Sequence, residues 1–191
     1  MNKIAIFASG NGTNAENVIK HFIGSKNCKV SVLICNKSDA YVMKRSEKFC
    51  INTYLCPRAK FQNGDVLKML IDMEIDYIIL AGFLLMLPAD IITHYNNKII
   101  NIHPSLLPKY GGKGMYGDNV HKAVSENGDT KTGITIHLVN EELDKGEILF
   151  QTECNIAAHE DFSSIATKVH NLEKEYFPKV IEDFILGKGS L

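Results

Sequence analysis

The sequence predicts an α/β fold, built on an open, mostly parallel twisted sheet with helices on both faces. Short apolar runs rich in β-branched residues alternate with segments of helical periodicity through the first half of the chain. The apolar runs are nearly continuous, as expected for strands that are covered on both faces. Later in the chain two strand patterns follow each other directly, which predicts at least one antiparallel strand.

The first half of the chain is expected to alternate strand and helix. Strands are predicted at residues 3–8, 29–35, 51–55, 76–81 and 98–102. Helices are predicted at residues 13–23, 40–49 and 65–73, and after Pro88. The first helix would place Val18, Ile19, Phe22 and Ile23 on one face, which is the spacing of an amphipathic helix that packs on a sheet.

The second half of the chain is expected to end the sheet with an antiparallel pair of strands, followed by a long helix. Residues 133–139 and 147–151 have strand patterns joined by a short connection around residues 144–146, which favours an antiparallel pair. Residues 161–184 form a long helical stretch, with an interruption expected near Pro178. The sequence contains no repeat or linker, so residues 1–191 are predicted to form a single domain.

Charge and cysteine content exclude several classes of protein. The 21 basic and 22 acidic side chains leave no positive excess that would indicate a nucleic-acid partner. The five cysteines are odd in number and include no C-x-x-C pair, and the first residues lack the layout of a signal peptide. The longest apolar run, residues 77–87, is too short to span a bilayer. We therefore expect a cytoplasmic protein of small-molecule chemistry, with no membrane association and no metal.

A glycine-rich loop follows the first predicted strand and reads Ser9-Gly-Asn-Gly-Thr-Asn-Ala15. Glycine lets the backbone turn tightly, and the helix that follows presents its N–H groups and the positive end of its dipole. The loop therefore predicts an anion site at Gly12, Thr13 and Asn14. Thr13 and Glu16 also have the spacing of a capping box, which would fix the start of the helix.

Two other interpretations of this loop stay open. Gly10, Gly12 and Ala15 satisfy the loose dinucleotide-binding pattern G-x-G-x-x-G/A. That pattern also requires an acidic residue at the end of the second strand, where this chain has Cys35-Asn-Lys37 instead. The remaining interpretation is a glycine turn that binds no ligand.

Asn101 and His103 lie two residues apart at the end of a predicted strand, so their side chains should point to the same face. Ligands of open α/β folds bind at the carboxyl ends of strands. An amide donor beside an imidazole suits acyl transfer, since Asn101 can donate to a developing oxyanion and His103 can move protons. A hydrogen-bonded pair with a purely structural role is the alternative.

Three further residues bear on this pair. A carboxylate at Asp144, placed near His103, would favour the imidazolium form, although an Asp shortly before a glycine is also common in turns. His137 is predicted to be a buried, hydrogen-bonded histidine that could line the site. His121 follows a second glycine-rich loop and could face a ligand.

Several of these segments together resemble the folate-dependent formyltransferases. They are Asn101-Ile-His-Pro-Ser-Leu-Leu-Pro-Lys-Tyr110, Gly133-Ile-Thr-Ile-His-Leu-Val139 and the stretch Glu142-Leu-Asp-Lys-Gly146. The resemblance covers essentially the whole chain in matching order, and the loop Ser-Gly-Asn-Gly-Thr-Asn is similar to that of the phosphoribosylglycinamide branch. It implies a Rossmann-like formyltransferase fold. It also implies transfer of a formyl group from 10-formyltetrahydrofolate to the amine of glycinamide ribonucleotide, a step of de novo purine biosynthesis.

The resemblance also implies residue roles. Asn101, His103 and Asp144 match the catalytic set, Gly12, Thr13 and Asn14 would hold the substrate phosphate, and Glu173 matches a contact to the glycinamide part. Folate would contact Asn101 and the residues Leu84, Leu85, Met86, Leu87, Asn140 and Glu141. Lys60 is the weak candidate for a second basic folate contact.

No residue clearly aligns with the second basic folate contact of the family, and the chain departs from the family pattern in two further places. Leu85 stands where the family often has an arginine, and the loop of residues 111–117 is longer and richer in glycine than the family pattern. Two alternative functions share the same residues. A related hydrolase would release formate from the folate, and a non-catalytic module would bind a phosphate-bearing ligand without turnover.

Overall fold

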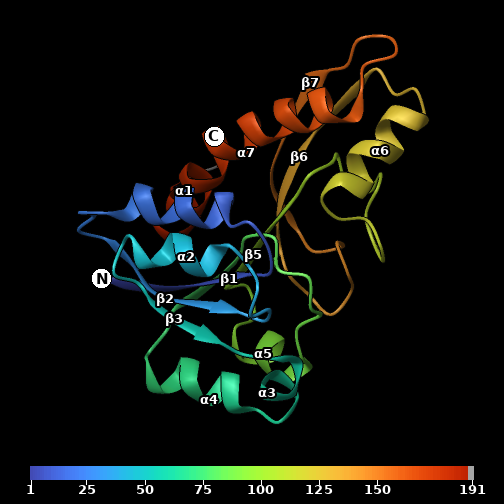
Figure 1. Cartoon of the computed structure of the whole chain (residues 1–191). Helices are drawn as coiled ribbons and strands as arrows, with labels where there is room; N and C mark the ends of the chain where they lie inside the picture. The colour runs from blue at the N-terminus through green and yellow to red at the C-terminus, as the bar shows by residue number, and fades with distance from the viewer. Residues whose placement is uncertain (189–191) are drawn as a thin grey trace. The chain divides into compact units, whose positions relative to one another are not determined.

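The structure is a computed structural model that describes residues 1–188, and its backbone is drawn in Figure 1. Within it the chain groups into two compact units, Met1–Ile100 and Asn101–Leu191. The first unit contains the alternating strands and helices that the sequence predicts. The second contains the late strands and the long final helix.

Within the described residues, seven strands form one sheet in the order β3-β2-β1-β4-β5-β6-β7. β1 pairs in parallel with β2 and β4, and β2 pairs in parallel with β3, whereas β6 and β7 are antiparallel. The predicted fold class and the predicted late antiparallel strand are therefore confirmed. The strands are β1 (Asn2–Ala8), β2 (Cys28–Cys35), β3 (Asn52–Leu55), β4 (Tyr77–Leu80), β5 (Ile99–His103), β6 (Lys131–Leu138) and β7 (Ile148–Asn155).

The central strands of the first unit form its core. Residues Ile4 to Ala8 of β1 are fully buried, as are Leu33 and Ile34 of β2. Such burial on both faces explains why these strands are continuous apolar runs in the sequence. The helices of this unit are α1 (Thr13–Phe22), α2 (Val42–Glu47), α3 (Arg58–Gln62), α4 (Asp65–Asp72) and α5 (Ala89–His94).

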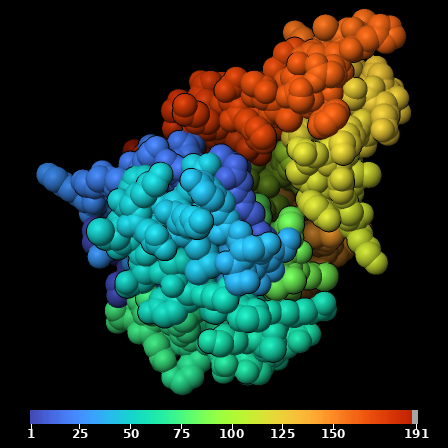
Figure 2. Space-filling model, in the orientation of Figure 1, coloured from blue at the N-terminus to red at the C-terminus, as the bar shows by residue number. Residues whose placement is uncertain are grey.

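The second unit holds α6 (Asp118–Glu126) and α7 (Phe162–Ile185), which pack against each other and lie side by side in Figure 2, α6 in yellow and α7 in orange to red. Asp161 caps α7, since its Oδ1 accepts from the N–H groups of Ser163 at 2.9 Å and Ser164 at 3.1 Å. This cap is the start signal that the sequence carries for the helix.

The predicted interruption near Pro178 is wrong, because α7 runs through it without a break. Proline removes one backbone donor inside a helix. Here the flanking Phe177 and Ile181 are fully buried, and Pro178 itself is buried. Tertiary packing of this face therefore outweighs the local cost of the proline.

Two helices were not among the predicted elements, namely α3 and α6. α3 has only five residues, too few for a periodic pattern. α6 buries Val120, His121 and Val124, and the histidine in this apolar set obscures the period. Among the described residues, no helix is both long and apolar enough to cross a bilayer.

His121 makes the stability of α6 sensitive to acid. Its side chain is 1% exposed, and its Nδ1 atom has no hydrogen-bond partner within the described part of the chain. Burial, together with repulsion from His170, lowers the pKa of His121 from 6.5 to about 4, against a weaker raising effect of Asp118. The unfolded chain therefore binds a proton between these values that the folded chain does not.

We expect the free energy of unfolding to be highest above pH 6.5, where His121 is neutral in both the folded and the unfolded chain. It should fall as the pH drops towards 4, because the unfolded chain then binds a proton at His121 that the folded chain does not. The loss attributable to His121 between pH 7 and pH 4.5 should be about 2 kcal/mol. Urea unfolding at the two pH values measures it, with His121→Gln as the non-titrating comparison. If wild type and His121→Gln lost the same free energy of unfolding on acidification, the expectation would be wrong.

Candidate active site

Neighbouring strands of the second unit bring three polar side chains together. Asn101 and His103 lie on β5, and His137 lies on β6, the next strand of the sheet. The Nδ2 atom of Asn101 is 3.0 Å from Nε2 of His137. His103 and His137 are 4% and 2% exposed, so both rings lie in a largely dry environment. The prediction that His137 is buried and hydrogen-bonded is confirmed.

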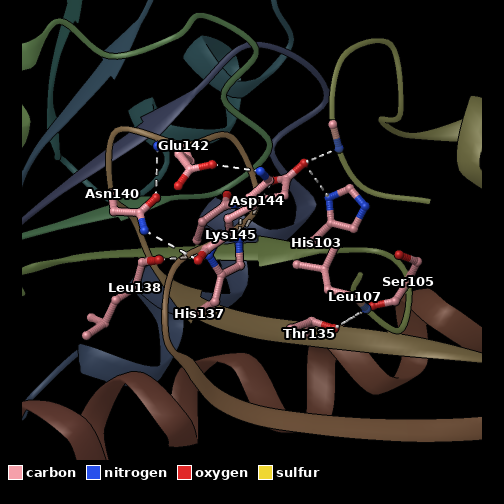
Figure 3. Close-up of polar contacts among 12 residues, drawn as sticks. His103, Ser105, Leu107, Thr135, His137, Leu138, Asn140, Glu142, Asp144 and Lys145 are labelled. Atoms are coloured by element: carbon pink, nitrogen blue, oxygen red, sulfur yellow. Dashed lines mark hydrogen bonds and ion pairs between the residues drawn. The ribbon is translucent and has the colours of Figure 1, made fainter. Parts of the chain in front are cut away.

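Asp144 places its carboxylate between the two imidazole rings, as Figure 3 shows. Oδ2 is 3.7 Å from Nδ1 of His103, and Oδ1 is 3.8 Å from Nε2 of His137. Both distances are longer than a direct hydrogen bond, so the coupling is electrostatic. The sequence predicted the proximity of Asp144 to His103 only as one of two alternatives, and the structure bears out that alternative.

The hydrogen bonds indicate which nitrogen of each ring carries a proton. His137 Nδ1 lies 2.8 Å from the carbonyl oxygen of Leu138, and His103 Nε2 lies 2.7 Å from that of Tyr110. A carbonyl only accepts, so both nitrogens are N–H donors. In neutral His137, Nε2 is then an acceptor, and the Asn101 amide donates to it. This contact orients the Asn101 amide, whose second N–H remains available to donate elsewhere.

Burial is the main cause that lowers the pKa of His137, and it outweighs the raising effects of the Leu138 carbonyl and of Asp144. His137 is therefore neutral near pH 7, as its role of acceptor for Asn101 requires. It serves as an anchor for the amide, while His103 keeps Nδ1 directed at the carboxylate.

The loop between β6 and β7 fixes the position of Asp144. Asp144 has a left-handed φ of 56°, and its Oδ2 accepts from the N–H of Gly112 at 2.8 Å. Gly146 passes so close to β6 that a Cβ there would lie 1.7 Å from the carbonyl oxygen of Leu138. The glycine in this segment is therefore required for close backbone approach, which brings the carboxylate to the rings.

The glycine-rich loop of the first unit ends at Gly12, which is the N-cap of α1 with φ 78°. The predicted capping box is wrong, because the cap has no side-chain hydrogen bond and Thr13 is already helical. Glu16 is engaged elsewhere: hydrogen bonds from Lys20 and then Arg45 lower its pKa. Because no side chain caps α1, the N–H groups at the start of this helix can bind an external anion.

Helix α2 holds this loop in shape. Arg45 donates from Nε to the carbonyl oxygen of Asn11 at 2.7 Å and from Nη2 to its Oδ1 at 3.1 Å. The N–H of Val42 donates to the carbonyl oxygen of Gly10 at 3.1 Å. A Cβ on Gly12 would lie 2.2 Å from Cγ2 of Val42, so only glycine fits this turn.

Replacing Gly12 by alanine should therefore distort the loop and weaken binding of a phosphate-bearing ligand by about tenfold or more, since a left-handed non-glycine residue alone costs about 1–3 kcal/mol. Titration with ribose 5-phosphate, followed by NMR, would measure the affinity. Gly24→Ala is the matched control, because Gly24 has φ 75° but open space around it. Equal affinities of the two variants would contradict the expectation.

The remaining predicted site residues lie on both units. In the first unit Leu84 and Met86 are exposed, Leu85 is half-buried and Leu87 is buried, while Lys60 lies exposed on α3. In the second unit Asn140 and Glu141 are exposed beside the Asp144 loop, and Glu173 is buried on α7. Their predicted roles in substrate binding stay predictions. Within residues 1–188, no three His, Cys, Asp or Glu side chains are grouped to hold a metal.

Sequence reasoning missed two contacts of the site. The carbonyl of Tyr110 and the N–H of Gly112 hold His103 and Asp144 through backbone atoms, which no residue pattern reveals. The anchoring role of His137 could have been found, since Thr135 and His137 alternate with buried Ile134 and Ile136 along β6 and so share one face of the strand.

Comparison with known proteins agrees with this geometry. A family model described as formyl transferase matches residues 2–181. The chloroplastic phosphoribosylglycinamide formyltransferase of Arabidopsis thaliana is 37% identical over 186 residues, which cover 94% of this chain and 64% of that protein. The chain thus spans less than two thirds of the length of this plant relative.

Bacterial relatives match along nearly their whole length. The phosphoribosylglycinamide formyltransferase of Haemophilus influenzae is 34% identical over 197 residues, covering 98% of this chain and 89% of that protein. The crystal structure of the enzyme of the same name from Anaplasma phagocytophilum superimposes with a TM-score of 0.89 at 28% identity, covering 98% of this chain and 88% of that one. The chain therefore belongs to the formyl transferase family, within its phosphoribosylglycinamide formyltransferase branch.

Proposed function

We propose that this chain transfers a formyl group from 10-formyltetrahydrofolate to the amine of glycinamide ribonucleotide. The observation that carries the proposal is the Asp144 carboxylate between His103 and His137, with the Asn101 amide oriented beside them. Membership of the family supports the same reaction. An amide donor, a proton carrier and a fixed negative charge are what acyl transfer to an amine requires.

In this mechanism the substrate amine attacks the formyl carbon, a C–N bond forms, and the carbonyl electron pair moves to oxygen. The remaining N–H of Asn101 and the Nδ1–H of protonated His103 stabilise that oxyanion. The bond from the formyl carbon to folate N10 then breaks. The proton that the amine loses is delivered to N10 through His103 or water.

The charge of Asp144 stabilises His103 while the ring carries its second proton. Nδ1 of His103 faces the carboxylate at 3.7 Å, which is too long for a direct hydrogen bond, so the Nδ1 proton remains available for transfer. Holding two substrates in one orientation adds to this chemistry, and alone can contribute roughly 7–11 kcal/mol.

The proposed substrate contacts are those that the resemblance to the family implies. Gly12, Thr13 and Asn14 would hold the phosphate at the open start of α1, and Glu173 would contact the glycinamide part. Leu84, Leu85, Met86 and Leu87 are proposed folate contacts in the first unit, and Asn140 and Glu141 are proposed folate contacts in the second. Leu85 stands where the family often has an arginine and cannot pair with a carboxylate, and Lys60 is the weak candidate for the second basic folate contact.

An absorbance assay for deformylated folate, run with and without glycinamide ribonucleotide, tests the proposal. Product that forms only when the amine is present supports the transferase. Product without the amine would identify the hydrolase instead. Binding of the ribonucleotide with no product in either condition would identify a non-catalytic module.

A further inference from the structure

We infer that Tyr110 and Asp129 are positioning residues that fix the ring and the tautomer of His103 from outside the catalytic group. The inference rests on the proposed function, because it concerns how that reaction's proton carrier is held. It arises from a set of polar contacts within the second unit that the proposed mechanism does not use.

Asp129 is the centre of these contacts and lies just before β6. Its carboxylate accepts from Lys109 Nζ at 3.0 Å on each oxygen, from Asn127 Nδ2 at 2.8 Å, and from the hydroxyl of Tyr110 at 2.9 Å. The Asp129 side chain is only 14% exposed. Burial and the bond to Asp129 raise the pKa of Tyr110, so the phenol remains a donor. We call Lys109, Tyr110 and Asp129 the Asp129 clamp.

The clamp acts on His103 through the backbone of Tyr110. The same residue whose hydroxyl is bound by Asp129 presents its carbonyl oxygen to His103 Nε2 at 2.7 Å. Tyr110 has a φ of 55°, a left-handed conformation that costs free energy for a residue with a Cβ. Ser105, fully buried, donates to the carbonyl oxygen of Lys109 at 2.6 Å and holds the preceding residue.

A strained residue persists only where its surroundings hold it, and here Asp129 and Ser105 hold the two sides of Tyr110. With Nε2 committed to the Tyr110 carbonyl, the proton that His103 gains and loses is the one on Nδ1. That is the nitrogen that faces Asp144. Without the clamp the carbonyl could rotate away and the ring could adopt the other tautomer or tilt.

Tyr110→Phe removes the hydroxyl and keeps the ring, so it tests the clamp directly. We expect kcat to fall about 10- to 100-fold, the size of effect that a displaced catalytic group produces, with KM for both substrates nearly unchanged. The ¹⁵N and ¹H signals of the His103 ring are the second readout. Wild type should show a slowly exchanging Nε2–H, and the variant should lose it.

Substitutions of Asp129, the acceptor of the Tyr110 hydroxyl, provide a second test of the clamp. Asp129→Ala should reproduce the effect of Tyr110→Phe, and the double variant should be no worse than either single variant, because both act through one contact. Asp129→Asn retains an acceptor for the phenol and should recover part of the rate. If one of these variants fails to fold, the remaining variants still test whether the Asp129 clamp holds His103.

The matched control is Glu153→Gln. Glu153 pairs with Lys131, which lines the same surface pocket as Asp129 and Lys109. Loss of the ion pair between Glu153 and Lys131 should leave kcat and the Nε2–H signal of His103 unchanged. The inference is overturned if Tyr110→Phe and Asp129→Ala keep the wild-type kcat, or if kcat falls while the Nε2–H signal persists. His103→Ala separates the two claims: a wild-type rate there would refute the proposed function itself.

Discussion

Replacing Asn101 by alanine is expected to lower kcat by about 10²–10³-fold, the typical contribution of one oxyanion donor in an enclosed site. The Asn101 amide is oriented by His137 at 3.0 Å, and His137 is locked as an acceptor by its own bond to the Leu138 carbonyl. The donor therefore needs no reorganisation when negative charge develops on the formyl oxygen. Steady-state kinetics with saturating substrates would measure the effect.

The binding of glycinamide ribonucleotide serves as the internal control for Asn101→Ala. Calorimetry should give a dissociation constant close to that of wild type, because the proposed phosphate contacts lie at Gly12, Thr13 and Asn14. A wild-type kcat would remove Asn101 from the mechanism. A large loss of affinity with an unchanged kcat would make Asn101 a binding residue instead.

Replacing Asp144 by asparagine is expected to lower kcat by about 10²–10⁴-fold, the range of general acid–base assistance. The substitution is nearly isosteric, and the amide oxygen can still accept from the Gly112 N–H that now binds Oδ2 at 2.8 Å. The loop should therefore remain in place while the charge 3.7 Å from His103 Nδ1 is lost. The imidazolium that forms during proton transfer would then lack its counter-charge.

A titration of His137 by NMR would show whether the charge acts as the geometry indicates. Asp144 raises the pKa of His137 against the dominant effect of burial, so Asp144→Asn should lower that pKa further. The bond between Asn101 and His137 should persist, since it requires neutral His137. An unchanged rate together with an unchanged His137 titration would show that Asp144 is only a turn residue.

The sequence by itself determined the fold class and the pairing of two site residues, Asn101 and His103. Continuous apolar runs predicted buried parallel strands because a strand covered on both faces has no polar side. The two-residue period of a strand predicted that Asn101 and His103 share one face. The shared motifs identified the family, and the spacing of Asp144 from Gly146 pointed to the turn that carries the carboxylate.

Other features were decided only by the tertiary structure, because they depend on groups far apart in the chain. Glu16 binds Arg45 rather than capping α1, and buried neighbours carry α7 through Pro178. The position of Asp144 between two rings depends on the Gly146 backbone meeting β6. The carbonyl of Tyr110 that orients His103 is a backbone atom, present in every residue, so its role follows from where folding places it and not from its identity.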